Sequence, residues 1–378
     1  MIAHVALVVA IVLVVARLAG ELALRVKQPP VLGELVAGVV LGAIPSQFSR
    51  DVAADASIDL LAQLGVLLLL FEVGLESTVR DLLAVGPAAA RVAVFGTLGS
   101  FAFGFACAHL ALPGATLATK VFVGASITAT SIGITARVFK DLDRARSAEA
   151  RTILGAAVLD DVLGLVLLAL VTGWLRDKGS GGASLVRLAI ETIVVLGVAI
   201  AVGLKVTPRI FAMAARLRAP GVLLAMGLSF CFFFSWGADR MGLAPIIGAF
   251  AAGLVLEEQK ALRPLVEPIA QFLVPIFFVV MGARADVRAF AHPGTLLLAG
   301  ALVVAASLGK IACALGAARG TNRLAIAIGM LPRGEVTLIY ASLGLSLGVI
   351  DSAVYSAMVL AVVVTTLVTP TALKWSLR

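Results

Sequence analysis

One apolar run of the chain reads ILGAAVLDDVLGLVLLALVTGWL, from Ile153 to Leu175, with two adjacent carboxylates near its middle. A helix needs roughly 20 apolar residues to cross a bilayer, and a break at Asp160 and Asp161 would leave two pieces too short to do so. We therefore expect both carboxylates inside the membrane, where each ionised group costs on the order of a few kcal/mol. A pair kept at that cost indicates an ion or proton site.

The composition indicates a polytopic α-helical membrane protein. The chain has 378 residues, of which 61% are hydrophobic and only 14% charged, and its mean hydropathy is +1.09. A soluble protein would carry far more charge. Neither end has a long polar stretch, so we expect no soluble regulatory domain. The net charge of +8 comes from Lys and Arg spread over short loops, which is typical of membrane topology and argues against nucleic-acid binding.

The apolar segments predict thirteen transmembrane spans, of which the second and the ninth are short. Loops after odd-numbered spans hold most of the Lys and Arg, for example Lys140, Arg144 and Arg151. The positive-inside rule places those loops in the cytoplasm, so the N-terminus is expected outside and the C-terminus inside. The predicted spans are 2–25, 30–44, 57–79, 87–111, 115–140, 148–175, 183–213, 219–237, 242–257, 262–283, 293–318, 322–348 and 350–375.

An internal repeat is visible in the letters. The second span reads PVLGELVAGVVL from Pro30, and the ninth reads PIIGAFAAGLVL from Pro245. The third and tenth spans also match, with Gly74 opposite Gly282. Partners seven spans apart cross the membrane in opposite directions, so the pattern predicts an inverted-topology repeat, a signature of secondary transporters. Chance similarity between helices rich in small residues is the alternative.

The same offset pairs two spans that are predicted to be broken. The fifth contains the polar patch ITATSIGITA, residues 127–136, and the twelfth contains GMLPRGEVT, residues 329–337. Pro332 removes an amide donor from the helical hydrogen-bond ladder. Interrupted helices at equivalent places in two repeats indicate a transport site, and their ends supply partial charges at mid-membrane.

Few ionisable residues fall within the predicted spans, and they suggest a division of roles. Lys310 lies in a continuous apolar run and needs a carboxylate partner. Neighbours on a helix point about 100° apart, so one of the paired aspartates can meet Lys310 while the other faces a cation path. Hydroxyls of Thr130 and Ser131 would add hard oxygen ligands. The intramembrane set is Glu34, Glu72, Asp160, Asp161, Glu191, Lys310, Arg333 and Glu335.

Structural roles remain as alternatives for several of these residues. Glu34, Glu72 and Glu191 suit helix interfaces or a vestibule. Arg333 and Glu335 could neutralise helix ends or each other. Thr130 and Ser131 could serve as ordinary interhelical hydrogen-bond partners.

Other chemistries fit the residues less well. The three cysteines form no CxxC pair and the three histidines do not cluster, so we expect no disulfide, no zinc and no resident metal or cofactor. An intramembrane aspartyl protease, which would make the protein an enzyme, needs carboxylates from separate helices and a GxGD motif, and here they are adjacent without it. An organic-anion/sodium symporter and a cation channel remain as rivals.

Three motifs together carry a resemblance. TATSIGITARVFKDL (Thr128–Leu142), AAVLDDVLGL (Ala156–Leu165) and GMLPRGEVTLI (Gly329–Ile339) resemble the monovalent cation:proton antiporter-2 family, most of all its NapA-type sodium/proton antiporters. The resemblance implies a homodimer with the NhaA-type fold and two crossed, discontinuous helices. It also implies a core domain from about 57–175 and 262–348, and a dimerisation domain from about 2–44, 183–257 and 350–375.

The resemblance also implies roles for single residues. Asp161 would be the main cation and proton carboxylate, with Thr130 and Ser131 beside the transported Na⁺. Asp160 would pair with Lys310 and exchange a proton, while Arg333 and Glu335 would stabilise the crossing region.

The activity implied is exchange of Na⁺, or Li⁺, for protons across a bacterial inner membrane by alternating access. Exchange of K⁺ for protons within the same family is the alternative. Potassium-efflux relatives under thiol control differ from this chain in their motifs and carry a nucleotide-binding domain that this sequence does not show.

Overall fold

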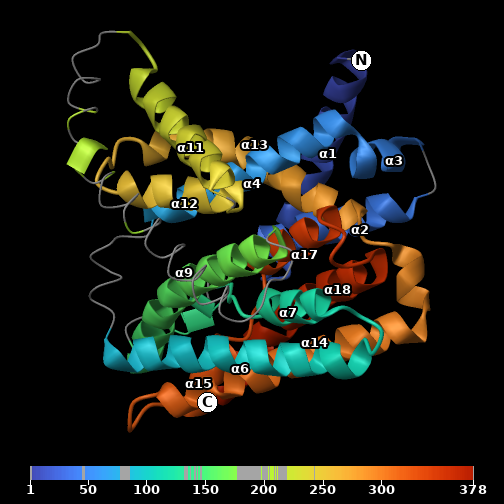
Figure 1. Ribbon diagram of the computed structural model, residues 1–378, viewed down its shortest axis with the longest axis vertical. Helices are drawn as coiled ribbons and strands as arrows, with labels where there is room; N and C mark the ends of the chain where they lie inside the picture. Colours follow the sequence, from blue (N-terminus) through green and yellow to red (C-terminus); the bar gives the residue numbers. More distant parts are fainter. Residues whose placement is uncertain are drawn as a thin grey trace. The chain divides into compact units, whose positions relative to one another are not determined.

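Helices account for all regular structure in the described part of the chain (Figure 1). Within the described residues, eight spans are long and apolar enough to cross a membrane, which confirms the all-α polytopic class. They are α1 (Ile2–Arg25), α4 (Ala56–Glu76), α6 (Pro87–Ala111), α9 (Ala148–Arg176), α11 (Val222–Arg240), α13 (Arg263–Ala283), α14 (Pro293–Ile311) with α15 (Cys313–Gly316), and α18 (Ser352–Ser376). The computed structural model describes residues 2–44, 47–76, 86–131, 135–136, 138–139, 142, 144, 147–176, 197, 203, 205–207, 209, 211, 219–241 and 243–377.

Shorter helices complete the architecture. The two spans expected to be short are α2 (Pro30–Ala43) and α12 (Pro245–Val255). The sequence did not predict α3 (Gln47–Ala54) or the 3-10 helix η1 (Val287–Ala291) in the connections. Most of the expected span 183–213 lies outside the described residues, so the count of thirteen stays a prediction. The remaining short helices are α7 (Leu117–Ser126), α16 (Arg323–Gly329) and α17 (Glu335–Ser346).

Local sequence signals explain where the helices begin. Proline occupies the first helical position of α2, α6, α12 and α14, where its fixed φ suits a helix and its missing N–H costs nothing. Side-chain oxygens cap other starts, as Asn322 does by accepting from the Ala325 N–H. Before α4, the N–H groups of Ser57 and Ile58 donate to Asp55 and hold the pKa of this exposed carboxyl below its ordinary value.

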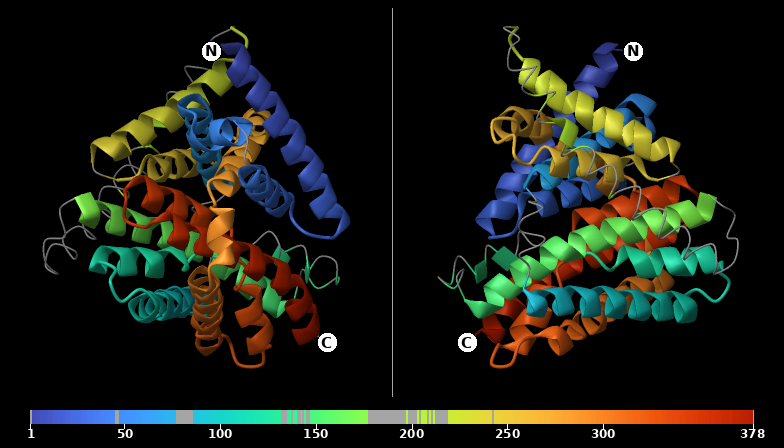
Figure 2. Two further views of the ribbon diagram at one scale, coloured as in Figure 1. Left: turned by 90° about the vertical axis from the view of Figure 1, so that its right-hand side faces the viewer. Right: turned by 60° about the vertical axis from the view of Figure 1, so that its left-hand side comes forward.

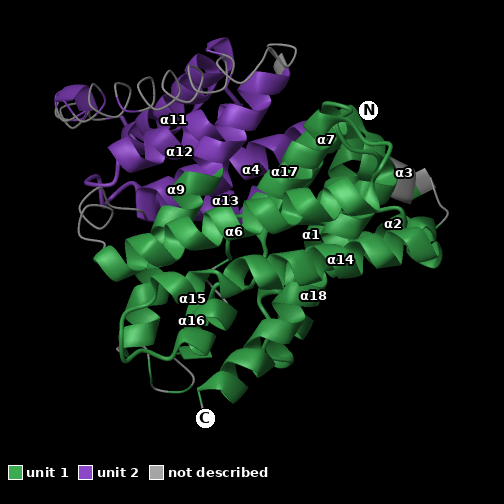
Figure 3. Cartoon of the chain, turned by 60° about the horizontal axis from the view of Figure 1, so that its bottom comes forward, with its two compact units in different colours: residues 1–58, 84–164, 278–378 green, residues 59–83, 165–277 purple. Residues whose placement is uncertain are grey.

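The chain divides into two compact units, coloured separately in Figure 3. Unit 1 comprises Met1–Ile58, Ala84–Gly164 and Phe278–Arg378, and unit 2 comprises Asp59–Leu83 and Leu165–Phe277. Each unit therefore combines segments that are distant in the sequence. The expected division into a core domain and a dimerisation domain rests on the family resemblance and stays a prediction.

Within unit 1, α6 packs against α7, α14 and α15, and α18 packs against α14, α16 and α17. Figure 1 shows α6 and α14 running alongside one another, and Figure 2 shows α1 beside α2. A buried apolar cluster joins α6, α9, α16 and α18 through small and branched side chains such as Ala93, Ile153, Met330 and Leu373. This core fixes the helices that carry the charged residues.

Two glycine contacts repeat between the halves of the sequence. Gly38 of α2 lies against α13, where an added Cβ would stand 2.9 Å from the Cα of Gly282. Gly253 of α12 lies against α4, where an added Cβ would stand 2.8 Å from the Cα of Gly74. The sequence repeat pairs Gly38 with Gly253 and Gly74 with Gly282. Corresponding glycines thus make corresponding contacts.

A second pair of glycines extends the correspondence. Gly33 of α2 meets the backbone of Ala19 in α1, and a Cβ there would lie 2.6 Å from the Ala19 carbonyl carbon. Gly248, its partner in the repeat, meets α11, with a Cβ 2.7 Å from the Cα of Ser235. Close backbone approach at both glycines favours a true repeat over chance similarity between small-residue helices.

Candidate functional site

The two helices predicted to be broken are interrupted, and the interruptions lie side by side. Helix α7 ends at Ser126 and the chain through residue 131 is not helical, while α16 and α17 are separated by residues 330–334. The Ser131 N–H donates to the Pro332 carbonyl at 2.8 Å. The Thr130 hydroxyl donates to the Met330 carbonyl at 2.9 Å. Each interruption therefore satisfies backbone groups of the other.

The residues PRG, 332–334, explain the second break. Pro332 offers no N–H to continue the helical ladder. Gly334 packs directly on Ser131, where an added Cβ would lie 2.6 Å from the Ser131 Cβ. Only glycine leaves room for this approach, so the sequence that stops α16 also lets the two non-helical segments meet.

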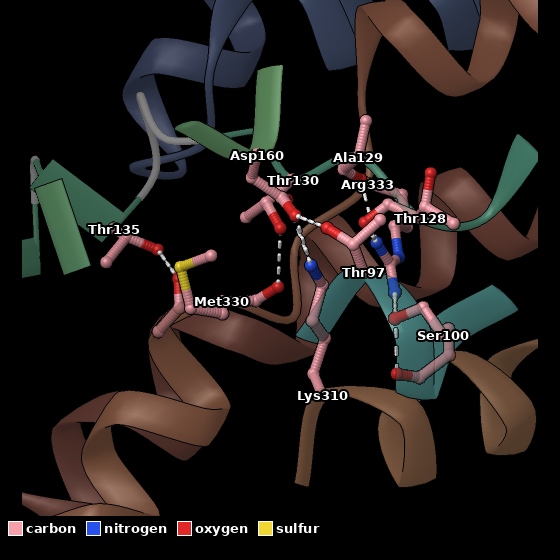
Figure 4. A network of polar contacts seen from close by, with 12 residues as sticks. Thr97, Ser100, Thr128, Ala129, Thr130, Thr135, Asp160, Lys310, Met330 and Arg333 are labelled. Atoms are coloured by element: carbon pink, nitrogen blue, oxygen red, sulfur yellow. Dashed lines mark hydrogen bonds and ion pairs between the residues drawn. The ribbon is translucent and has the colours of Figure 1, made fainter. Parts of the chain in front are cut away.

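Arg333 points at the end of α7. Its guanidinium is buried and donates to the carbonyls of Thr128 at 2.8 Å and Ala129 at 2.7 Å, just beyond that helix. It also contacts the Ser100 hydroxyl at 3.2 Å and the Ala306 carbonyl at 3.4 Å (Figure 4). Because carbonyl groups at a helix C-terminus carry partial negative charge, the cation neutralises that end.

Glu335 occupies the opposite kind of helix end. It is the first residue of α17 and is half-buried, and its carboxylate accepts from the Ser131 hydroxyl at 3.3 Å. A negative charge at a helix N-terminus is favourable. Arg333 and Glu335 thus each serve a helix end, which agrees with the first of the two roles expected for them, and no ion pair joins them in the described structure.

Asp160 and Lys310 form a buried ion pair. The Lys310 ammonium lies 2.9 Å from Oδ2 and 3.1 Å from Oδ1 of Asp160, and both side chains are almost wholly buried, at 1% exposure or less. Asp160 comes from α9 and Lys310 from the last turn of α14. The sequence predicts that Lys310 pairs with one of the two aspartates, and in the structure its partner is Asp160.

Asp161 differs from its neighbour. It is half-buried, and among the described residues none forms a hydrogen bond or ion pair with its carboxyl. Glu335 lies close enough to act on it electrostatically. One turn further along α9, a Cβ added at Gly164 would lie 3.2 Å from the Cβ of Ala129. The Gly164 carbonyl accepts a hydrogen bond from the Tyr340 hydroxyl at 2.9 Å. Of the paired carboxylates, Asp160 is neutralised by Lys310, whereas Asp161 has no such partner among the described residues.

Two further predicted carboxylates belong to helices α2 and α4. Glu34 is buried in α2, with Arg17 acting on it electrostatically. Glu72 is half-buried in α4 of unit 2, near Glu76 and Arg263. Glu191 falls outside the described residues.

Two residues of α6 were missed by sequence reasoning. Thr97 donates to Asp160 Oδ1 at 2.9 Å, and Ser100 contacts Arg333. They occur in the stretch GTLGS, residues 96–100. Small residues alternating with hydroxyls in a membrane helix indicate close packing and interhelical hydrogen bonds, and that signal was available in the sequence.

Comparisons with known proteins place the chain in a family. The family described as "Sodium/hydrogen exchanger, transmembrane" matches residues 9–378. The high-affinity Na⁺/H⁺ antiporter NhaS3 of Synechocystis is 35% identical over 94% of this chain and 86% of its own length. The Na⁺/H⁺-K⁺ antiporter GerN of Bacillus cereus is 33% identical over 97% and 95%.

A solved structure shares the fold. The sodium proton antiporter MjNhaP1 from Methanocaldococcus jannaschii superposes with a TM-score of 0.73 at 18% identity, covering 98% of this chain and 97% of that one. The family match spans nearly the whole sequence and includes both interrupted helices and the paired aspartates. The chain therefore belongs to the sodium/hydrogen exchanger family of membrane proteins.

Proposed function

We propose that this protein is a secondary active antiporter that exchanges Na⁺ for protons, with Asp161 as the carboxylate for which the two compete. The observation that carries the proposal is the contrast within the aspartate pair. Lys310 neutralises Asp160 in a buried site, whereas Asp161 is half-buried and has no partner among the described residues. A carboxylate inside the membrane that has no fixed partner is suited to binding a cation reversibly.

In this proposal Thr130 and Ser131 would supply further oxygen ligands. The hydroxyls of Thr130 and Ser131 donate their protons to the Met330 carbonyl and to Glu335, which leaves the lone pairs of both hydroxyl oxygens available to a cation. Hard cations prefer such oxygen ligands. In this proposal Arg333 stabilises the end of α7 and Glu335 stabilises the start of α17.

One site is enough to couple the two fluxes. A proton on Asp161 removes the charge that holds Na⁺, and bound Na⁺ excludes the proton, so each is carried only when the other has left. Alternating access then requires that the site open to one side at a time. The NhaA-type architecture with thirteen spans, inverted repeats and two crossed discontinuous helices would provide it, with the core domain moving against the dimerisation domain of a homodimer.

Placement in the membrane completes the proposal. We infer a multi-pass protein of a bacterial inner membrane, with the N-terminus outside and the C-terminus in the cytoplasm, because basic residues gather in the loops assigned to the cytoplasm. K⁺/H⁺ exchange is the second candidate, and the name of GerN, a Na⁺/H⁺-K⁺ antiporter, favours it.

The test uses purified protein in liposomes with an internal pH dye, to which each alkali chloride is added in turn. We expect Na⁺ to drive proton flux in the wild type and Asp161→Asn to abolish it. Asp239→Asn, at an exposed position near the end of α11, serves as the control and should transport normally. Sodium-driven proton flux that survives in Asp161→Asn would refute the role of Asp161, and flux without proton coupling in the wild type would indicate a channel.

A further inference from the structure

A cavity of about 670 Å³ lies among helix ends that all belong to unit 1. The ends of α2, α13 and α17 line it, together with α3 and the start of η1. Its volume falls within the range of small-molecule sites, roughly 300–1,000 Å³. Because helices that cross a bilayer end near its surface, we expect the cavity at the level of the lipid headgroups.

The walls of the cavity are mostly apolar, and three charged side chains interrupt them. Ala283 and Leu345 are among the apolar residues, and the charged ones are Arg284, Asp286 and Arg288. Two guanidinium groups stand against one carboxylate, so both signs of charge are present with an excess of positive charge. Such a lining matches an amphiphilic ligand whose polar part also carries both signs.

The two arginines differ in how firmly they are held. Arg284 is half-buried, and its Nε–H donates to the Ala53 carbonyl of α3 at 3.1 Å, which fixes the side chain at the wall. Arg288 is exposed, and none of the described residues forms a hydrogen bond or ion pair with its guanidinium. Guanidinium groups bind phosphate oxygens in a planar, bidentate geometry. The pair therefore provides a phosphate site with one fixed and one adaptable member.

The Asp286 carboxylate supplies the opposite charge. Its Oδ1 accepts the Arg288 N–H at 2.9 Å, and its own N–H donates to the Ser356 hydroxyl at 2.9 Å, so its position is fixed from two sides. A carboxylate has about four lone-pair sites, which leaves Asp286 with acceptor capacity. The carbonyl ends of α2, α13 and α17 add partial negative charge. This part of the cavity favours a cationic group and disfavours a ligand that is only anionic.

We propose that the cavity binds the headgroup of a phospholipid that carries a primary amine, that is, a phosphoethanolamine group. The phosphate lies against Arg284 and Arg288, and the ammonium lies against Asp286. An ammonium has three N–H donors for the carboxylate and the carbonyl ends, whereas a quaternary amine has none. The apolar walls suit the glycerol and the first acyl carbons, which favours a lipid over the soluble headgroup. The inference does not depend on cation exchange.

The test measures lipid binding to the purified protein in detergent. Short-chain phosphatidylethanolamine, phosphatidylcholine and phosphatidylglycerol are added in turn, and soluble phosphoethanolamine forms a fourth arm. Native mass spectrometry counts the bound lipid, and tryptophan fluorescence follows thermal unfolding. We expect phosphatidylethanolamine to bind in preference to the other three additions and to raise the apparent Tm by about 3–5 °C at saturation.

Two variants separate the two halves of the site. Arg288→Gln should weaken binding of phosphatidylethanolamine about tenfold, because a charge-assisted hydrogen bond to phosphate is lost. Asp286→Asn keeps an oxygen that can accept the Arg288 N–H but loses the negative charge, so its preference for ethanolamine over choline should disappear. Arg323→Gln is the matched control, since Arg323 is an exposed arginine at the first residue of α16 and does not line the cavity.

Equal binding of the three lipids, or no bound lipid, would overturn the inference, and this comparison needs only the wild type. An Arg288→Gln protein that binds phosphatidylethanolamine as tightly as the wild type would also overturn it. If soluble phosphoethanolamine reproduces the full effect, the headgroup chemistry is supported and the assignment to a lipid is wrong. Binding is measured without cation flux, so a failure of the proposed exchange and a failure of this inference are distinguishable.

Discussion

Replacing Lys310 by methionine would remove the charge of the buried ion pair while keeping most of the side-chain volume. The ammonium lies 2.9 Å from Asp160 Oδ2, and the two side chains are 1% and 0% exposed. At this distance the gross attraction is about 6 kcal/mol with an effective dielectric constant of about 20. Removing one partner of a buried pair costs about 3–5 kcal/mol, because the other charge is left buried and uncompensated. We expect Lys310→Met to lower the free energy of unfolding by about that amount.

Thermal unfolding in detergent, followed by tryptophan fluorescence, measures the effect. The expected fall in apparent Tm is roughly 5–10 °C, scaling from about 2 °C per kcal/mol in large domains. Asp160→Asn combined with Lys310→Met removes both charges and should recover most of the loss. Arg25→Ala is the control, since it breaks an ion pair whose side chains are 72% and 55% exposed, and such pairs contribute at most about 1 kcal/mol.

Two results would refute the reasoning. If Lys310→Met unfolds at the wild-type temperature, the pair does not carry the stability assigned to it. If the double variant is as unstable as the single one, the loss arises from packing around position 310 and not from an unpaired carboxylate.

The remaining predictions concern packing, the helix ends and competition. Gly38→Ala and Gly253→Ala should each destabilise the protein by about 1–3 kcal/mol, because the new methyl groups would meet backbone; Gly294→Ala, where an added Cβ meets nothing within 4 Å, should melt like the wild type, and equal melting of all three would contradict the repeat contacts. Arg333→Lys should lose exchange in the liposome assay, since one ammonium cannot replace both Nη1, which donates to the carbonyls of Thr128 and Ala129, and Nη2, which contacts Ser100; a fully active variant would show that charge alone suffices. Exchange should slow on acidification as protons occupy Asp161, and a rate unchanged between about pH 8 and about pH 5 would contradict competition for one carboxylate.

The ion pair was predictable from the sequence because an unpaired charge inside the membrane is energetically costly. An ammonium at position 310, in an apolar run, demands a carboxylate. The angle between adjacent residues on a helix then separates Asp160 from Asp161 before any coordinates are known. The breaks at residues 127–131 and 330–334 were predictable for a similar reason, because proline, glycine and clustered hydroxyls disfavour an uninterrupted helix.

Hydrogen bonds from side chains to backbone groups could not be predicted from the sequence. Arg333 donates to the backbone carbonyls of Thr128 and Ala129. Because every residue has a backbone carbonyl, the amino-acid sequence does not identify which carbonyls are bound. Thr97 was missed because its importance depends on which face of α6 meets α14. The short helix α3 was missed since its polar stretch, Gln47–Ala54, has no apolar run to reveal it.

The paired glycine contacts have a consequence for biosynthesis. Gly38 packs against α13, and Gly253 packs against α4. Each contact therefore joins a segment that is synthesised early to one that is synthesised late. While the second half of the chain is still being synthesised, α2 lacks the helix against which Gly38 packs. The Gly38 contact can therefore form only after the chain has been extended past Gly282.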